Sequence, residues 1–249
     1  MTGDEAGDDP PAAAPDRSRR RRGGRKKRVR QHVNPLGFIR EVTLPDWRQV
    51  FPAGRPQVDG PGGALAPLAS APTRPMEVDV GCATGEFLLG RAAQTPGRLI
   101  VGLEIRVPVV SQVQGRIARA GLSNAACVLC NANASFEALF APGSLRVVYV
   151  HFPDPWFKPR HHKRRLVTPA FVDVVASRLE AGGEFEFMTD FGAYAAEVVP
   201  LVEAHPAFEN ATAPGAPAPF VTGRVLSHRE AWHLGKGDPV HRYVWRRRP

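Results

Sequence analysis

The chain has 249 residues, 43% of them hydrophobic, which is enough for one large domain with extensions. Lysine and arginine number 33 against 24 acidic residues, and the formal charge of +9 favours a polyanionic partner, either nucleic acid or an anionic membrane surface. No apolar stretch of about 18 residues occurs, which argues against a membrane span. Three cysteines are too few and odd in number for a disulfide framework, which favours the cytoplasm.

The N-terminal part of the chain has the composition of a tail and a linker. Residues 1–30 are acidic and then basic, with ten Arg or Lys among residues 17–30, and they predict a disordered segment that contacts nucleic acid electrostatically. A solubility tail or a targeting signal is the alternative interpretation of that basic run. Residues 31–75 predict an irregular lead-in and a Pro/Gly/Ala-rich linker, and residues 76–249 the folded domain.

Short apolar runs alternate with helical patterns along the folded domain. The predicted strands are residues 76–80, 99–104, 125–129, 146–150, 184–189 and 240–245, and the predicted helices are 87–93, 107–120, 136–140, 169–179 and 193–203. This alternation predicts an α/β fold with a mostly parallel sheet and helices on both faces. Ligands of such sheets bind at the carboxyl ends of the strands.

Three of those strand ends carry residues suited to a nucleoside cofactor. Gly81 and Gly85 shape a tight turn, although Ala83 breaks the spacing of a dinucleotide fingerprint. Glu104 ends the second strand, where a carboxylate can bind a ribose diol, and Asn131 follows the third with an amide suited to adenine. This set fits S-adenosylmethionine better than NAD. Asp79 is either a ligand for the cofactor's ammonium group, directly or through water, or a structural carboxylate.

The fourth strand leads into the most informative stretch, residues 151–165. One carboxylate, Asp154, stands between two prolines, followed by Trp156 and then a cluster of cations. A rigidly held carboxylate beside an aromatic ring suits a base, and the cations suit phosphates. The stretch therefore predicts a site acting on a base within a nucleic acid, with a simple turn and a solvated charged face as the alternative.

These motifs together resemble those of the tRNA (guanine-N7-)-methyltransferases. The matching segments are residues 152–158 with 160–165, 101–106, 79–82, 131–132, 32–35 and 46–47. The resemblance implies a Rossmann-like class I S-adenosylmethionine-dependent methyltransferase fold with a seven-stranded sheet. It implies methyl transfer from S-adenosylmethionine to N7 of a variable-loop guanine, position 46 of tRNA. Ala83 departs from the family, which usually has glycine there, and residues 227–230 match its late Thr-x-x-Glu motif loosely.

The resemblance also assigns roles to residues of this chain. Asp154 is implied as the catalytic carboxylate. The cofactor positions are Asp79, Gly81, Glu104, Arg106, Asn131 and Ala132. The implied tRNA contacts are Lys158, Arg160, His161, His162, Lys163, Arg164, Arg165, Asp190, Ser227 and Glu230. No metal is expected, because Cys127 and Cys130 have no second ligand pair and are interpreted as small buried hydrophobes.

Guanine N7 carries a free lone pair and no proton, so the predicted reaction needs positioning and electrostatics more than a general base. Two other functions stay open at this point: a related methyltransferase acting on another RNA or a small molecule, and a noncatalytic RNA-binding protein with the same fold. The sequence does not distinguish a monomer from a homodimer or from a complex with an accessory subunit.

Overall fold

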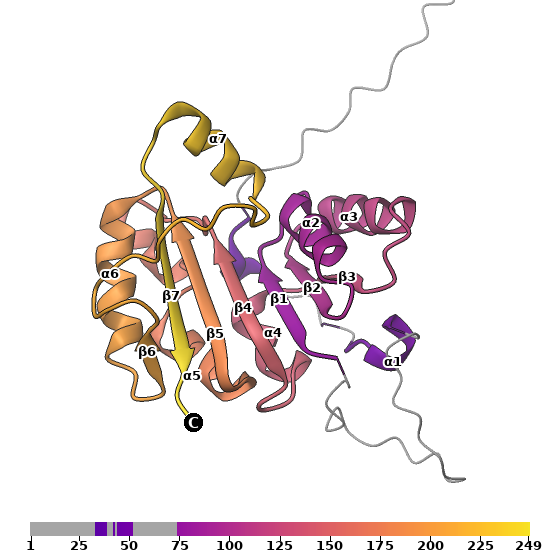
Figure 1. Cartoon of the computed structure of the whole chain (residues 1–249), viewed down its shortest axis with the longest axis horizontal. Coiled ribbons are helices and arrows are strands. Elements are labelled where there is room, and N and C mark those ends of the chain that lie inside the picture. The colour runs from indigo at the N-terminus through magenta and orange to yellow at the C-terminus, as the bar shows by residue number, and fades with distance from the viewer. Residues whose placement is uncertain (1–32, 39–41, 43, 52–73) are drawn as a thin grey trace, which may run out of the picture. The chain divides into compact units, whose positions relative to one another are not determined.

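The computed structural model describes residues 33–38, 42, 44–51 and 74–249 (Figure 1). The predictions for residues 1–30, His32 and most of the linker lie outside the described residues. The described part of the chain has no helix that is both long and apolar enough to span a bilayer.

A seven-stranded sheet forms the centre of the domain, in the order β3-β2-β1-β4-β5-β7-β6. The strands are β1 (Met76–Val80), β2 (Leu99–Glu104), β3 (Ala125–Leu129), β4 (Leu145–His151), β5 (Leu179–Thr189), β6 (Phe208–Asn210) and β7 (His241–Arg247). β1 to β5 run parallel, whereas β7 is antiparallel to β5 and β6. The predicted mostly parallel α/β sheet is therefore confirmed.

The helices between these strands also follow the predicted alternation. They are α2 (Glu86–Gln94), α3 (Val107–Arg119), α4 (Ala132–Leu139), α5 (Pro169–Arg178) and α6 (Gly192–Glu203). The sequence did not predict β6 or α7 (His228–Lys236), and α4 begins four residues earlier than predicted. Before the sheet lie a 3-10 turn, η1 (Pro35–Gly37), and the short α1 (Trp47–Val50).

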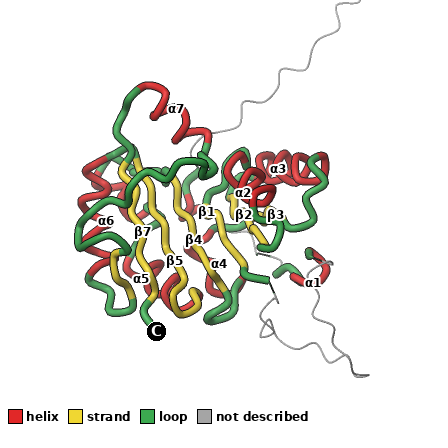
Figure 2. The backbone as a smooth tube through the Cα atoms, viewed as in Figure 1, coloured by secondary structure: helices red, strands yellow, loops and turns green. Residues whose placement is uncertain are grey.

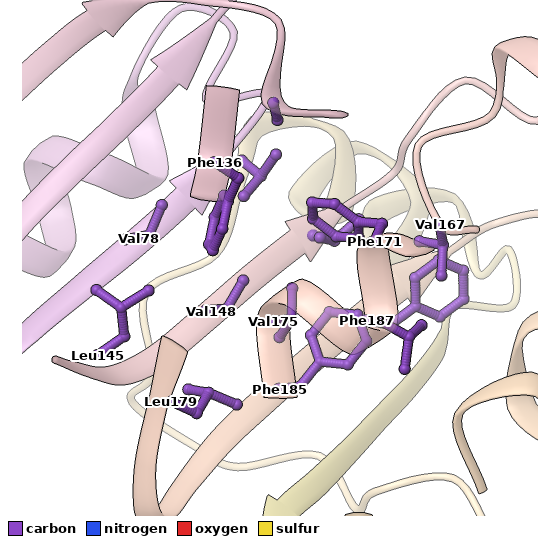
Figure 3. Packing of buried hydrophobic residues seen from close by; sticks show 14 of the residues in the cluster. Val78, Phe136, Leu145, Val148, Val167, Phe171, Val175, Leu179, Phe185 and Phe187 are labelled. Carbon is purple, nitrogen blue, oxygen red and sulfur yellow. The ribbon is translucent and has the colours of Figure 1, made fainter. Parts of the chain in front are cut away.

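The larger core lies on one face of the sheet, under α4, α5 and α6. Alternation along β1 and β4 sends Val78 and Val148 to this face, where they meet Phe136 and Phe171 from the covering helices (Figure 3). Each such side chain stabilises the fold by about 1.5–3 kcal/mol through burial. The lead-in joins this core, since Trp47 donates from Nε1 to the Leu139 carbonyl oxygen over 3.1 Å.

The other face of the sheet is covered unequally. α2 and α3 pack over β2 and β3 with a second apolar cluster. Over β4, β5 and β7 a loop, residues 211–227, crosses the sheet instead of a helix (Figure 2). Backbone hydrogen bonds from Ala211 and Ala218 tie this loop to β7, and Val225 packs against Phe87 and Tyr149.

The strand order reverses between β1 and β4, because the chain runs outward through β2 and β3 and then returns to the other side of β1. Such a switch point leaves a crevice at the carboxyl ends of the two strands. The turn after β1 and the motif after β4 therefore face each other across it.

Candidate active site

A cavity of about 560 Å³ opens at the carboxyl ends of β1, β2, β3 and β4. Its wall contains the implied catalytic carboxylate and every implied cofactor residue: Asp79, Gly81, Glu104, Arg106, Asn131, Ala132 and Asp154. These residues lie at or just after the ends of four different strands, so the parallel sheet brings them together. Asp154 thus shares one cavity with Gly81 and Glu104, as the sequence predicted.

The turn after β1 approaches β2 closely. The N–H groups of Gly81 and Cys82 both donate to the Leu103 carbonyl oxygen, at 2.8 and 3.1 Å. Gly81 and Ala83 have φ of 79° and 48°, a left-handed conformation that glycine adopts freely and alanine only with strain. The departure at Ala83 therefore replaces glycine at a position whose backbone conformation favours it.

Glu104 ends β2 with its carboxylate held by local donors. Oε1 accepts from the N–H groups of Ile105 and Arg106, at 2.8 and 2.9 Å. The Arg106 guanidinium adds two more hydrogen bonds, Nε to Oε1 at 2.9 Å and Nη2 to Oε2 at 2.8 Å. The hydrogen bonds to Glu104, together with the nearby charge of Asp154, raise the pKa of Arg106. This pair fixes the carboxylate in the cavity wall.

Asp79, at the end of β1, is only 2% exposed. Burial raises the pKa of its carboxyl to about 6, while the charge of His151 lowers it and that of Glu104 raises it. An anion in this position has lost most of its hydration, so a cation entering the cavity would stabilise it.

Asn131 joins the lead-in to the cavity. It precedes α4 directly, and its Nδ2 donates to the Pro35 carbonyl oxygen over 3.0 Å. Val33 and Pro35 line the cavity as well. The amide oxygen of Asn131 accepts no hydrogen bond within the described residues, which leaves an acceptor for a ligand.

The loop that carries Asp154 has an unusual backbone. Phe152 and Trp156, two residues to either side, have φ of 49° and 47°. Left-handed conformations cost bulky residues about 1–2 kcal/mol each, and such strain gathers at functional sites. Between the two bends, Pro153 and Asp154 lie at the cavity wall.

Arg165 holds this loop from inside the protein. It is 7% exposed, its Nε donates to the Pro155 carbonyl oxygen over 2.8 Å, and its Nη1 pairs with Glu197. Its guanidinium also lies 4.7 Å over the Tyr194 ring. Arg165 was predicted to contact tRNA, but the structure commits its guanidinium to partners within the protein.

The rest of the cationic run forms the short helix η3 (Pro159–Arg164). Lys158, Arg160 and Lys163 are exposed, and His161 and His162 are half-buried. Arg164 reaches the cavity wall and lies 5.1 Å over the Trp156 ring. The side chains turned to solvent can hold phosphates next to the cavity.

Comparisons with known proteins agree with this geometry. A family model described as "Putative methyltransferase" matches residues 73–243. The tRNA (guanine-N(7)-)-methyltransferase of Thermosynechococcus vestitus is 37% identical, with 88% of this chain and 95% of that protein covered. The tRNA (guanine-N(7)-)-methyltransferase of Microcystis aeruginosa is 36% identical, with 89% of this chain and 98% of that protein covered. This chain belongs to the tRNA (guanine-N7-)-methyltransferase family.

The fold agrees with that membership. The crystal structure of the antibiotic-resistance methyltransferase Kmr superimposes with a TM-score of 0.50 at 17% identity, over 73% of this chain and 90% of that one. At that identity the likeness shows the fold alone, which is the Rossmann-like methyltransferase fold that the sequence predicted.

The family's late motif lies on the loop and helix that close one side of the cavity. Ser227 caps α7, its hydroxyl accepting from the Glu230 N–H over 3.2 Å. Glu230 is 1% exposed and pairs with Arg224. Glu230 was predicted to contact tRNA, but its carboxylate lies inside the protein, whereas Ser227 lines the cavity.

Asp190, which follows β5, also has partners within the methyltransferase domain. It accepts from Arg229 at 2.8 Å and pairs with His233 at 3.1 Å. Burial pushes its pKa up, but the hydrogen bond from Arg229 and the other donors lower it below the usual value. Neither Asp190 nor Lys158 is part of the cavity wall, although Arg229, which binds Asp190, lines it.

Two features of this site escaped sequence reasoning. His151, the first residue of the 151–165 stretch, lines the cavity, but a single histidine at a strand end carries no pattern that would assign it a role. α7 was missed although Ser227-x-x-Glu230 has the spacing of a helix-capping box, because the segment was interpreted as a substrate motif alone. Cys127 and Cys130 are buried free thiols, as predicted.

Proposed function

We propose that this chain transfers a methyl group from S-adenosylmethionine to N7 of a guanine in tRNA, forming N7-methylguanosine. The observation that carries the proposal is the position of Asp154, which lines one cavity with the implied cofactor residues and adjoins the exposed cations of residues 158–163. The names of the relatives at 36–37% identity support the same reaction.

The residues of the cavity fit the cofactor. Asp79 offers a buried anion to the ammonium group of the cofactor, and Glu104 offers a carboxylate to its ribose. Asn131 and Ala132 offer polar groups to the edge of its adenine. The turn at Gly81 lets the backbone approach closely. When bound, S-adenosylmethionine supplies an electrophilic methyl group on a positively charged sulfur.

Asp154 provides the positioning for the purine. Its carboxylate can accept hydrogen bonds from N1–H and the N2 amino group of guanine, which directs N7 toward the cofactor side of the cavity. Methylation leaves positive charge on the purine, and a carboxylate held nearby stabilises that charge. No proton leaves N7, so Asp154 acts by position and charge rather than as a base.

The exposed cations bind the tRNA backbone next to the cavity. Lys158, Arg160 and Lys163 contact phosphates, and Arg164 does so beside Trp156 at the rim. His161, His162, Asp190 and Ser227 complete the proposed tRNA contacts. Trp156 stacks on a base or packs the loop, and the Arg164 guanidinium over its ring supports the packing role.

The test is transfer of labelled methyl from S-adenosylmethionine to unmodified tRNA, followed by borohydride and aniline cleavage, which cuts at N7-methylguanosine. We expect one cut at the variable-loop guanine, position 46. Asp154→Ala should abolish transfer while tRNA binding persists, and Glu209→Ala, a half-exposed acid of β6, is the control. Transfer of the labelled methyl group to another RNA but not to tRNA would contradict the proposed substrate. Binding of tRNA without any transfer would indicate a noncatalytic RNA-binding protein.

The same assay addresses the partners and the place of action. We propose that the chain acts in the cytoplasm, which its three unpaired cysteines support. Transfer by the purified chain alone would show that no accessory subunit is needed, and light scattering on that sample would give its oligomeric state.

A further inference from the structure

Helix α7 presents an exposed aromatic side chain that the proposed methyl transfer does not use. Trp232 is 50% exposed, although tryptophan side chains are mostly buried in folded proteins. Lys236, one turn further along the helix, places its Nζ 3.7 Å from the centre of the Trp232 ring. α7 lies beyond the carboxyl ends of β4 and β5, on the side of the sheet's edge where the cavity opens (Figure 1).

One face of α7 connects this ring to the cavity. His228, Trp232 and Lys236 follow one another at a spacing of four residues, so they lie on the same face of the helix. Arg229 stands next to His228, and these two residues line the cavity. All four side chains are exposed. Together they form the α7 stripe, which runs about 12 Å along the helix axis from the cavity wall.

The charges around the α7 stripe favour an anionic partner. Glu230, the acid of the helix itself, is buried and pairs with Arg224. Arg229 pairs with Asp190, whereas Lys236 lies over an aromatic ring rather than beside an acid. An exposed cation next to a flat ring suits a partner that combines phosphates with flat bases. A protein partner would instead be favoured by further apolar side chains on the same face.

The Trp232 ring is fixed relative to the loop that carries Asp154. The ring of His233, which is buried, lies edge-on to Trp232 with the ring centres 4.7 Å apart. His233 in turn stacks on Phe152, the residue that opens the loop, with the ring centres 5.9 Å apart. The exposed ring therefore stands in a defined position beside the proposed site of methyl transfer.

A target base inside the cavity creates a need for such a ring. Taking a guanine into the cavity removes it from the stack that it forms with its neighbours in the strand. The neighbouring base then exposes one face, which an aromatic side chain can cover. Trp232 stands one helical turn from His228 of the cavity wall, about 6 Å along the axis, so the adjoining nucleotide can reach it.

We propose that Trp232 stacks on the base of a nucleotide adjoining the target guanine, and that Lys236 binds the phosphate of that nucleotide. The inference rests on the proposed function, because it adds a contact to the same tRNA. The lysine side chain is long and flexible, so its ammonium moves from the ring to the phosphate when a base takes its place. Every base has a π-face, so the contact supplies affinity without selecting one base.

The test combines changes in the protein with changes in the RNA, and filter binding to the full chain measures each affinity. The RNAs are unmodified tRNA and two tRNAs that are abasic at one or the other neighbour of the target guanine. Trp232→Ala should bind unmodified tRNA about five- to a hundredfold more weakly, the range for one lost stack of a base on an aromatic ring. On one abasic tRNA it should cause no further loss, because the stacked base is already missing.

Three further variants serve as controls. Trp232→Phe keeps an aromatic ring and should retain most of the affinity. Lys236→Ala should lower the slope of log affinity against log salt by about 1, as for one lost phosphate contact. Leu234→Ala changes another exposed apolar side chain of α7, which lies off the α7 stripe, and should bind all three RNAs as the unaltered chain does.

Two results of these titrations would overturn the proposal. If Trp232→Ala weakened the binding of all three RNAs by the same factor, the ring would have a structural role and no base would stack on it. If tRNA affinity were unchanged but light scattering showed a lower mass for Trp232→Ala than for the unaltered chain, the α7 stripe would be a contact between copies of the chain.

A second measurement uses the unaltered chain. Fluorine-19 NMR after labelling with 5-fluorotryptophan gives one signal for each of the four tryptophans, and Trp232→Phe identifies that of Trp232 by its loss. This signal should move when unmodified tRNA is added. If it stays in place while the chain binds tRNA, this inference alone is overturned, whereas failure of the unaltered chain to bind tRNA overturns the proposed function too.

Discussion

Nε of Arg165 donates to the Pro155 carbonyl oxygen over 2.8 Å, across ten residues of the motif. The last cation of the run therefore belongs to the protein interior and holds the loop that carries Asp154. The cationic run 158–165 therefore contains two kinds of side chain. Arg165 points inward and shapes the site, whereas others, such as Arg160 and Lys163, face the solvent. The two groups should respond differently to substitution.

Removing the outer cations should change the salt dependence of tRNA binding. Arg160→Ala with Lys163→Ala removes two phosphate contacts, so the slope of log affinity against log salt should fall by about 1 to 2 while stability is unchanged. Arg165→Ala should leave the slope intact and lower the free energy of unfolding by about 2 kcal/mol, because Pro155 and Glu197 lose their donor.

Filter binding over a range of salt concentrations measures the slope, and urea denaturation measures stability. A slope that falls as much in Arg165→Ala as in the double variant would mean that Arg165 reaches the RNA after all. A double variant with an unchanged slope would remove η3 from the proposed tRNA interface.

The buried carboxyl of Asp79 should make stability depend on pH. Its pKa is about 6 in the folded chain against 3.8 for an ordinary aspartate, so the folded state binds the extra proton between those values. Stability is therefore highest below about pH 4 on this account and falls as pH rises through about 6. The difference corresponds to about 3 kcal/mol at neutral pH.

Asp79→Asn should remove that loss, raising the free energy of unfolding at pH 7 by up to about 3 kcal/mol, with the gain vanishing near pH 4. It should also weaken S-adenosylhomocysteine binding, since the ammonium loses its counter-charge. The neighbouring charges of His151 and Glu104 are retained in the variant. Urea denaturation at several pH values checks this, with the exposed Asp173→Asn as control; a gain independent of pH would contradict it.

Sequence patterns predicted the sheet and the position of the cavity because both depend on properties that short segments carry. Apolar runs and turn glycines identified β1 to β5, and the strand ends located Glu104 and Asn131. The three-residue β6 is too short to show a periodicity. Its pairing with β7 depends on residues more than thirty positions apart, which no local pattern records.

The direction of a charged side chain was the other property that the sequence did not reveal. Arg165 and Glu230 stand in polar segments that suggest solvent, yet each is buried because a partner elsewhere in the chain balances it. The sequence also does not predict the left-handed backbone at Phe152 and Trp156, since aromatic residues rarely adopt that conformation. Such features depend on tertiary contacts, and they lie beside the cavity.

Glu104→Gln should weaken the binding of every ligand that contains the ribose, whether or not that ligand carries the amino-acid tail. The substitution removes the charge that the Arg106 guanidinium binds at 2.8 and 2.9 Å and the proposed acceptor of the ribose diol. Affinity for S-adenosylhomocysteine and for 5′-methylthioadenosine should therefore fall by about the same factor, tenfold or more. Calorimetric titration measures both affinities. A loss of affinity confined to S-adenosylhomocysteine would mean that Glu104 contacts the amino-acid tail rather than the ribose.

Ala83→Gly should stabilise the protein although glycine normally destabilises. Ala83 has φ of 48°, and the relief of that left-handed strain outweighs the added freedom of the unfolded chain, for a net gain of about 0.5 kcal/mol. The control is Ala118→Gly on the exposed side of α3, which should cost about 1 kcal/mol as in other helices. Urea denaturation of the two variants measures both changes. If Ala83→Gly destabilised the protein as much as Ala118→Gly, residue 83 would not have a left-handed conformation in solution. The turn beside the cavity would then have a different backbone conformation from the one described.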